Sequence, residues 1–426
     1  MIEVVLGLAP VIMMLLGFPV FILLLTTCAV VVIFFLDLPL PILHQTVFGA
    51  VDKMALLAIP FFIFAGEIMV RGGMSRRIID WVLALSGGRK GSLGITAVGS
   101  STLFGAISGS SPATVATIGR LMTKPLLEAG YGERFSAGLL TSAGAIAVVV
   151  PPSISFILYG VAAEQPIDRL FIAGLLPGLV MACLMSFYTY TFVFKRNIKE
   201  GVNLDDVNLF RRTKEAIWAI GMPLIILGGI YLGIFSPTES AGIACVYAII
   251  VTVFIYKELS WTELWNSAVA SAYLTAQVMV IVSASGVFAW LLTIRGVPQM
   301  LAGHLAGSEM PTWALLILIN LFLLVVGCIL DTASAILVLT PILVPLVKIM
   351  GVDLIHFGVI MTVNLAIGMF TPPFGLNIFV AQAIFKMPLR TIYTGLLPFI
   401  VVNLVALVIV TYFPDLSMIL VRILDR

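Results

Sequence analysis

The chain has 426 residues, of which 61% are hydrophobic and 10% are charged, and its mean hydropathy is +1.17. Soluble domains carry about half apolar and about a quarter charged residues, so this composition excludes an ordinary soluble protein. The net charge of +2 comes without a basic patch, which argues against a nucleic-acid partner. Apolar stretches of about 20 residues recur along the chain and predict an all-α polytopic protein in a lipid bilayer.

The first apolar stretch, 4–36, is interrupted by a Gly-Phe-Pro sequence. It could form two short crossings or one strongly tilted helix. Farther along, Lys and Arg gather in 71–90 and again in 195–214, and the positive-inside rule places both segments on the cytoplasmic side. Both can lie there only if 91–118 enters the membrane and returns to the same side, as a re-entrant helical hairpin.

Two adjacent prolines interrupt the next apolar span, 135–163, within the sequence "VVVPPSIS". Proline removes a backbone donor and clashes with the preceding helical turn. Non-helical backbone at membrane depth is tolerated only inside protein or beside water. We therefore predict a broken helix that lines a cavity, with a plain kink in a packed helix as the alternative.

The second half of the chain repeats the first. The proline pair at 151–152 aligns with the pair at 372–373, and GLLP at 174–177 aligns with GLLP at 395–398, both at an offset of 221 positions. Duplication of this kind is typical of secondary transporters. The alternative explanation of this similarity is that both halves simply share a composition of helices and prolines, but a constant offset argues against it.

We therefore predict two repeats, 1–194 and 217–426, joined by a cytoplasmic linker at 195–216. The second repeat would hold its own hairpin at 313–347 and its own broken helix at 355–385. Each repeat would have an odd number of crossings plus one hairpin, and the odd number makes the second repeat inverted relative to the first.

Residues near the segment ends give further expectations. Trp261 and Trp265 lie beside charged residues, so the aromatic-belt rule predicts a segment along the membrane surface at 257–270. Its counterpart in the first repeat would be 37–52. Glu67 also lies near the end of a segment, and we expect it at the membrane interface.

Both hairpin tips gather small polar residues at membrane depth. The first tip, "SGSSP", offers Gly and Ser, and the second, "GCILDTASA", adds Asp331. Hydroxyls, carbonyls and a carboxylate form an oxygen cage suited to a hard cation, whereas half-helix N-termini suit a carboxylate anion. Because Asp331 is the only acid that we expect to be buried, Na⁺ and not H⁺ is the expected coupling ion. A small anion could then sit between two such sites.

Four stretches carry a resemblance to a known family: "GAISGSSPATVATIGRLMTKPLLEAGYG", "VVVPPSISFILYGV", "MPLIILGGIYLGIFSPTESAGIACVYAIIV" and "GMFTPPFGLNIFVAQAI". In this order they resemble the large membrane (M) subunit of TRAP transporters, the tripartite ATP-independent periplasmic uptake systems of bacteria and archaea. The resemblance covers essentially the whole chain. It implies a multi-pass protein of the cytoplasmic (inner) membrane with an elevator-type fold, in which hairpins and broken helices form a transport domain that moves against a scaffold.

The resemblance also implies function and partners. A periplasmic substrate-binding protein (P type) would deliver a small organic acid, and a small four-helix membrane subunit (Q type) would pair with this chain. Family substrates are mainly C4-dicarboxylates, sialic acids and other carboxylates, and a Na⁺ gradient drives their uptake. Beyond Na⁺, no cofactor is expected.

Matching the family's motif residue by residue gives two sets of expected ligands. The expected sodium-binding residues are Ser108, Gly109, Ser110, Ser111, Pro151, Ser153, Gly327, Asp331, Thr332, Thr371, Pro372 and Gly375. The expected substrate-binding residues are Ser110, Ser111, Ser153, Ser155, Thr332, Ser334 and Asn377. One position departs from the family: many members have an acidic residue shortly after the first tip, and this chain has Thr114 there.

The two alternative functions are a passive channel and an intramembrane protease. A passive channel would need no coupling ion. An intramembrane protease would need a base beside a serine nucleophile or a pair of buried acids, but the three histidines lie at segment edges or loops and Asp331 is alone. Small-residue helix packing and a structural role for Asp331 are the alternatives to a binding site. We therefore expect a transporter and not an enzyme.

Overall fold

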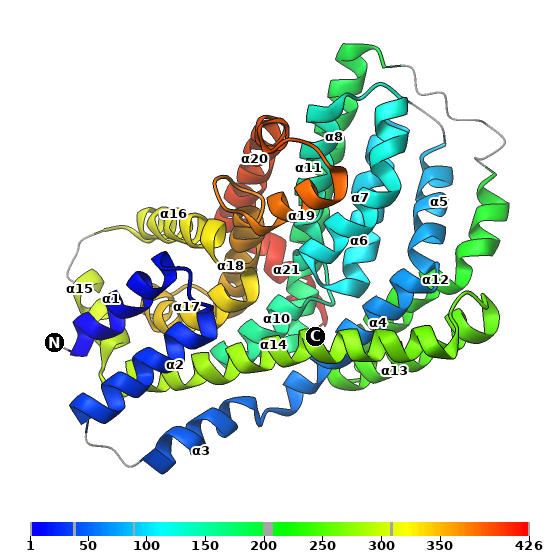
Figure 1. Ribbon diagram of the computed structural model, residues 1–426. Coiled ribbons are helices and arrows are strands. Elements are labelled where there is room, and N and C mark those ends of the chain that lie inside the picture. The colour runs from blue at the N-terminus through cyan, green and yellow to red at the C-terminus, as the bar shows by residue number, and fades with distance from the viewer. Residues whose placement is uncertain (1, 37–39, 88–89, 199–207, 307–309, 425–426) are drawn as a thin grey trace.

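The computed structural model describes residues 2–36, 40–87, 90–198, 208–306 and 310–424, and within these ranges the chain is helical without strands (Figure 1). The helices of the first half are α1 (Ile2–Leu15), α2 (Val20–Val31), α3 (Leu40–Val51), α4 (Ala58–Arg71), α5 (Met74–Ser86), α6 (Ser92–Ser108), α7 (Ser111–Glu128), α8 (Glu133–Ala143), α9 (Ile146–Val149), α10 (Ile154–Ala163) and α11 (Ile167–Arg196). Those of the second half are α12 (Leu209–Tyr231), α13 (Pro237–Ile249), α14 (Trp261–Ile294), α15 (Val297–Ala306), α16 (Thr312–Ile329), α17 (Thr332–Ile349), α18 (Leu354–Gly368), α19 (Leu376–Phe385), α20 (Leu389–Tyr412) and α21 (Pro414–Leu424).

The described helices have the lengths that a membrane protein needs. Eight of them are long and apolar enough to cross a bilayer, and the bent pair formed by Glu133–Val149 and Ile154–Ala163 can supply a ninth span. Because a spanning helix satisfies every backbone hydrogen bond within itself, this architecture follows directly from the apolar composition. The predicted all-α polytopic fold is confirmed.

The N-terminal stretch forms two helices and not one tilted helix. Helices α1 and α2 are separated at 16–19 and pack against each other, and α2 continues into a π-helical turn at Val32–Leu36. Pro19 lies directly before α2, where its missing N–H breaks no helical hydrogen bond. The Gly-Phe-Pro sequence therefore ends one helix and starts the next.

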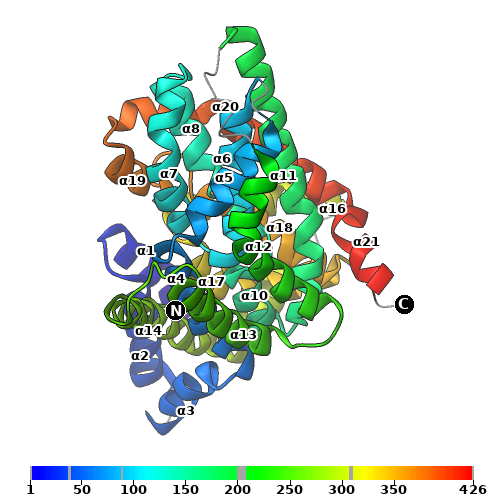
Figure 2. The ribbon, with the colours of Figure 1, turned by 90° about the vertical axis from the view of Figure 1, so that its right-hand side faces the viewer.

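The segment 257–270, predicted to lie along the membrane surface, does not form a helix of its own. These residues lead directly into α14, which is continuous over 34 residues and begins at a capping box in which Ser260 and Glu263 bond reciprocally. At about 1.5 Å per residue the helix is roughly 51 Å long, which exceeds a hydrocarbon core of about 30 Å. A helix of this length crosses the bilayer obliquely, extends beyond the apolar layer or runs partly along the membrane surface, and in Figures 1 and 2 it passes alongside α2, α3, α4 and α17.

In the first half of the chain, two shorter helices, α3 and α4, occupy the sequence positions that correspond to α14. At the repeat offset of 221 positions, the start of α14 corresponds to the start of α3. Here a break at Asp52-Lys53 and a 3₁₀ turn at Met54–Leu57 separate α3 from α4. Of the predicted counterpart 37–52, residues 37–39 lie outside the described residues.

The helices extend into the predicted linker at 195–216. Helix α11 runs to Arg196, and α12 begins at Leu209 after Asn208, whose side chain caps it by accepting from the Arg211 amide. Of the remaining linker, 199–207 lies outside the described residues.

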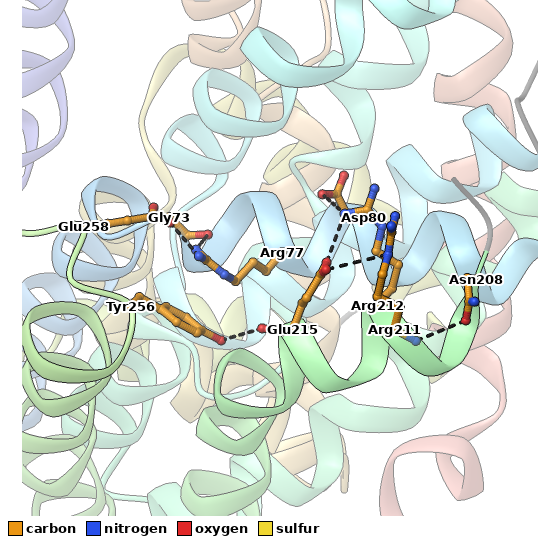
Figure 3. Close-up of polar contacts among 9 residues, drawn as sticks. All are labelled: Gly73, Arg77, Asp80, Asn208, Arg211, Arg212, Glu215, Tyr256 and Glu258. Atoms are coloured by element: carbon orange, nitrogen blue, oxygen red, sulfur yellow. Dashed lines mark hydrogen bonds and ion pairs between the residues drawn. The ribbon is translucent and has the colours of Figure 1, made fainter. Parts of the chain in front are cut away.

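A polar network joins the two basic segments at one end of the molecule (Figure 3). Arg77 donates to Glu258 at 2.6 Å, and its guanidinium lies 3.8 Å from the centre of the Tyr256 ring. Arg212 pairs with Asp80 at 3.2 Å, which fixes α12 against α5. Ion pairs this exposed contribute only about 0–1 kcal/mol each, so the network orients these helices more than it stabilises them.

Helices α8 and α20 approach each other so closely that only glycine fits between them. A Cβ atom at Gly395 would overlap the carbonyl of Arg134, and one at Gly138 would overlap the carbonyl of Gly395. The rings of Phe135 and Phe399 flank this contact with centroids 5.4 Å apart. Small residues let helix backbones pack closely in membranes, where van der Waals contact drives association. The contact fixes the first half of one broken helix.

This packing predicts that Gly395→Val separates α8 from α20. We expect a loss of about 1–3 kcal/mol of stability, typical of overpacking against a rigid neighbour, measured as a lower unfolding temperature of the purified protein in detergent. The matched control is Gly242→Val on α13, where an added Cβ meets nothing within 4 Å. Equal shifts in the two variants would contradict the close contact.

Candidate transport site

The first hairpin, α6 and α7, packs its tip onto the first broken helix. Gly109 takes a left-handed conformation (φ 56°) between the two helices, and a Cβ there would lie 3.2 Å from both the Pro152 carbonyl and the Ile154 amide. The break itself falls between α9 and α10, which meet at a bend of 43°. The non-helical backbone around the prolines is therefore covered by the hairpin tip.

The second hairpin, α16 and α17, contacts the second broken helix in a similar way. A Cβ at Gly368 would lie 2.5 Å from backbone atoms of Gly327, and the hydroxyl of Thr332 donates to the Met369 sulfur at 2.8 Å. Here α18 ends at Gly368 and α19 begins at Leu376. Unlike α6 and α7, the helices α16 and α17 touch little beyond their tip, because α16 packs along α18 while α17 packs along α10 and α14.

The two halves of the chain interlock at this point. Helix α7 packs on α19, and its repeat counterpart α17 packs on α10, so each hairpin contacts the broken helix of the other half. The side chain of Asn377 donates to the Ser111 hydroxyl at 2.7 Å and lies 3.4 Å from the Thr141 carbonyl. These bonds place the second break beside the first hairpin tip.

Both tips line one cavity of about 300 Å³. The predicted site residues on its wall are Ser108, Gly109, Ser110, Ser111, Ser155, Asp331 and Thr332. The other predicted residues do not line it, namely Pro151, Ser153, Gly327, Ser334, Thr371, Pro372, Gly375 and Asn377. Several of these lie behind the wall, where Ser153 donates to the Val148 carbonyl and Thr371 donates to the Ile367 carbonyl.

Asp331 is not fully buried, which corrects the expectation from sequence. Its carboxylate is the N-cap of α17 and accepts from the amide and the hydroxyl of Ser334. It lines the central cavity and also a neighbouring one that includes Phe374 and Phe379. The acid therefore has two roles open to it, helix capping and contact with whatever occupies the cavity.

Two polar residues of the cavity wall were missed in the sequence. Glu67 of α4 and Gln277 of α14 face the tips across the cavity, and Glu67 also pairs with Arg71 at 2.6 Å. Glu67, which we expected at the membrane interface, contributes to the cavity wall. Helical spacing could have predicted this position of Glu67. Residues Ile63, Gly66, Glu67 and Val70 share one face of α4, and all of them line the cavity.

The cap geometry differs between the two tips. Neither α7 nor α10 has a side-chain cap on its first amides, at Ser110 and Ser153, whereas Asp331 caps α17. Uncapped helix N-termini favour anions, and a carboxylate favours cations. Proline-broken spans, hairpin tips and a central cavity with both kinds of group define the chain as a multi-pass membrane protein of the transporter type.

Comparison with known proteins identifies the family. Residues 8–416 match the family model of the tripartite ATP-independent periplasmic transporter, DctM component. The chain is 38% identical to the C4-dicarboxylate TRAP transporter large permease protein DctM of Pseudomonas aeruginosa, covering 87% of each chain. It is 36% identical to the 2,3-diketo-L-gulonate TRAP transporter large permease protein YiaN of Escherichia coli, covering 91% of this chain and 92% of that one. The chain belongs to the family of TRAP transporter large permeases.

Two further comparisons concern length and fold. The chain is 40% identical to the isethionate TRAP transporter permease protein DctMQ of Oleidesulfovibrio alaskensis over 90% of its own length, but spans only 60% of that relative. The solved structure of the Alcanivorax borkumensis YdaH transporter, described as having an unusual topology, superposes with a TM-score of 0.60 at 15% identity, covering 97% of this chain and 99% of that one. At that identity the likeness concerns the fold alone.

The hydrogen bond between Asn377 and Ser111 predicts energetic coupling between the halves. In a double-mutant cycle with Asn377→Ala and Ser111→Ala, we expect a coupling free energy of about 0.5–1.5 kcal/mol, the net value of one hydrogen bond. Thermal unfolding in detergent measures it. The control cycle pairs Asn377→Ala with Ser110→Ala, because Ser110 makes no bond to Asn377 among the described residues. Equal coupling in both cycles would refute the contact.

Proposed function

We propose that this chain forms the translocation pathway of a sodium-coupled uptake system for a small organic acid. The observation that carries the proposal is the cavity between both hairpin tips, with a helix N-terminus that lacks a side-chain cap on one tip and a carboxylate on the other. Its volume of about 300 Å³ suits a ligand the size of a small acid. The substrate would lie across the tips, with Ser110, Ser111 and Thr332 within reach.

Sodium coupling rests on two side-chain groups: a buried oxygen of Asn377 without a hydrogen-bond donor among the described residues, and the carboxylate of Asp331, which is negatively charged although it accepts from Ser334. The side-chain oxygen of Asn377 is buried with no partner among the described residues, because the amide nitrogen takes the bonds to Ser111 and Thr141. An unpaired buried oxygen costs about 1–3 kcal/mol, and a cation beside it would remove that cost. The carboxylate of Asp331 supplies the corresponding oxygen at the second tip. We propose one Na⁺ at each place.

The names of relatives guide the choice of substrate. They specify C4-dicarboxylates, 2,3-diketo-L-gulonate and isethionate. We therefore propose a C4-dicarboxylate as the first substrate to test and sialic acid as the second. A periplasmic binding protein would deliver the acid, and a separate small membrane subunit would take the place of the additional length in the DctMQ relative. The complex would lie in the bacterial or archaeal inner membrane.

An elevator motion would carry the site across the bilayer. The cavity has two walls, one made by the hairpins and broken helices and the other by α4 and α14. In the proposed mechanism the first wall moves as a body and the second stays fixed as scaffold. The two halves of the chain would be repeats, as their constant sequence offset of 221 positions predicts, and the odd number of crossings expected in each would make them inverted.

Reconstitution with both partners tests the proposal. Proteoliposomes that contain this chain, the small subunit and the binding protein would be supplied with a panel of organic acids under a Na⁺ gradient, and then with K⁺ in place of Na⁺. We expect accumulation of one class of acid only with Na⁺. Flux that equilibrates equally with either cation would indicate a passive channel, and no flux for any acid would contradict the proposed substrate class.

A substitution at Asp331 can distinguish the role of its negative charge from its role as a helix cap. Asparagine caps helices as well as aspartate does, so Asp331→Asn should fold normally but require at least about tenfold more Na⁺ for half-maximal uptake, since a charge-assisted contact contributes about 1.5–3 kcal/mol. Asp331→Ala should abolish uptake without preventing membrane insertion.

The matched control is Asp353→Asn. Asp353 caps α18 by accepting from the amides of Ile355 and His356, and it lies outside the cavity wall. This variant should keep the normal Na⁺ dependence. An unchanged Na⁺ requirement in Asp331→Asn would remove Asp331 from the proposed sodium site.

A further inference from the structure

A second cavity, of about 510 Å³, lies at the end of the molecule where α8 and α20 begin and α11 ends. It shares no lining residue with the central cavity. Figures 1 and 2 show these three helices side by side at the upper end of the molecule, well away from α14. Its wall contains two cations, Arg134 and Arg196, and one carboxylate, Glu133. Nothing in the transport mechanism uses this group of charges.

The two arginines are available to bind a ligand. Both are exposed, and neither makes an ion pair with any residue that the structure describes. The guanidinium of Arg196 lies 5.6 Å from the centre of the Phe192 ring, which orients it. Arg134 is positioned by its backbone, because its carbonyl packs against Gly395 of α20 where no side chain would fit. A guanidinium group suits a phosphate, which it can bind through paired N–H donors.

The inner part of the cavity is aromatic. Phe135 stacks on Phe192 with centroids 3.8 Å apart, and Tyr188 lies 6.1 Å from Phe135. A cavity with charges at one side and aromatic rings at the other matches the headgroup region of a bilayer, where amphipathic rings gather. The basic end of the molecule, which includes Arg196, is the end that the positive-inside rule places at the cytoplasmic leaflet.

We propose that this cavity binds the headgroup of phosphatidylethanolamine from the cytoplasmic leaflet. The phosphate would pair with Arg134 and Arg196, and the ammonium group would pair with Glu133. The carboxylate decides the choice of lipid, because a purely anionic headgroup would leave Glu133 beside a negative charge, whereas the ethanolamine places a cation there. The bound lipid would hold together the ends of α8, α11 and α20. This inference requires only that the chain spans a membrane, and it is independent of the proposed substrate and coupling ion.

The test measures thermal unfolding of the purified chain in detergent with added phosphatidylethanolamine, phosphatidylglycerol or phosphatidylcholine. A ligand that binds only the folded state stabilises it by RT ln(1 + [L]/Kd), so at equal concentration the lipid that binds more tightly gives the larger rise in unfolding temperature. We expect the largest rise with phosphatidylethanolamine. In the double variant R134Q/R196Q, about tenfold more lipid or greater should be needed for the same rise, because at least one charge-assisted contact of about 1.5–3 kcal/mol is lost.

Two single variants separate binding from a structural effect. Glu133→Gln should remove the preference for phosphatidylethanolamine over phosphatidylglycerol while leaving phospholipid binding in place, and a carboxylate that only supports the start of α8 would not alter that preference. Lys124→Gln removes a positive charge from an exposed position on α7, outside the cavity wall, and should behave as the unaltered chain.

Three outcomes would overturn the proposal. One is an equal lipid response in R134Q/R196Q and the unaltered chain. Another is a stronger response to phosphatidylglycerol or phosphatidylcholine than to phosphatidylethanolamine in the unaltered chain. The third is an equal rise with inorganic phosphate at the same concentration, which would make the cavity a site for a free anion and not for a lipid.

Discussion

The constraint on which the structure depends is that unpaired backbone at membrane depth must be covered by protein. Two proline pairs break two spans, and each break is covered by a helical hairpin whose tip is short and small. An added Cβ would lie 3.2 Å from the Pro152 carbonyl at Gly109 and 2.5 Å from the Gly327 backbone at Gly368, so glycine allows a close approach at both breaks. The broken helices therefore depend on the hairpins, because the hairpin tips cover the backbone that the breaks would otherwise expose to lipid.

The same constraint concentrates chemistry at the centre of the molecule. Every interrupted helix leaves free amides at one end and free carbonyls at the other, and the hairpin tips bring these ends to a common cavity. The tips are not equivalent, since Ser110 leaves the start of α7 uncapped whereas Asp331 caps α17. Two tips that the sequence predicts to be repeat counterparts thus differ, because one is suited to an anion and the other to a cation. That asymmetry is what makes coupled movement of an acid and Na⁺ a reasonable proposal for this cavity.

Much of the architecture could be predicted because its causes are local. Proline pairs, small-residue tips and apolar run lengths fixed the hairpins near 91–118 and 313–347 to within a few residues of their first helix boundaries, though α7 continues to Glu128. The continuity of α14 was not predicted. The tryptophans at 261 and 265 suggested a segment along the membrane surface, whereas a capping box at Ser260 and Glu263 starts a helix there that has no internal break and runs on to Ile294.

The sequence by itself determined where the spans must be interrupted, because proline geometry and the cost of bare backbone act within one helical turn. Only the tertiary structure decided which side chains meet in the cavity, because that depends on how helices distant in sequence are rotated and packed. Glu67 and Gln277 reach the cavity from α4 and α14, and Asn377 reaches Ser111 from the other half of the chain. Asp331 was expected to be buried, and the structure leaves it partly exposed at the start of α17.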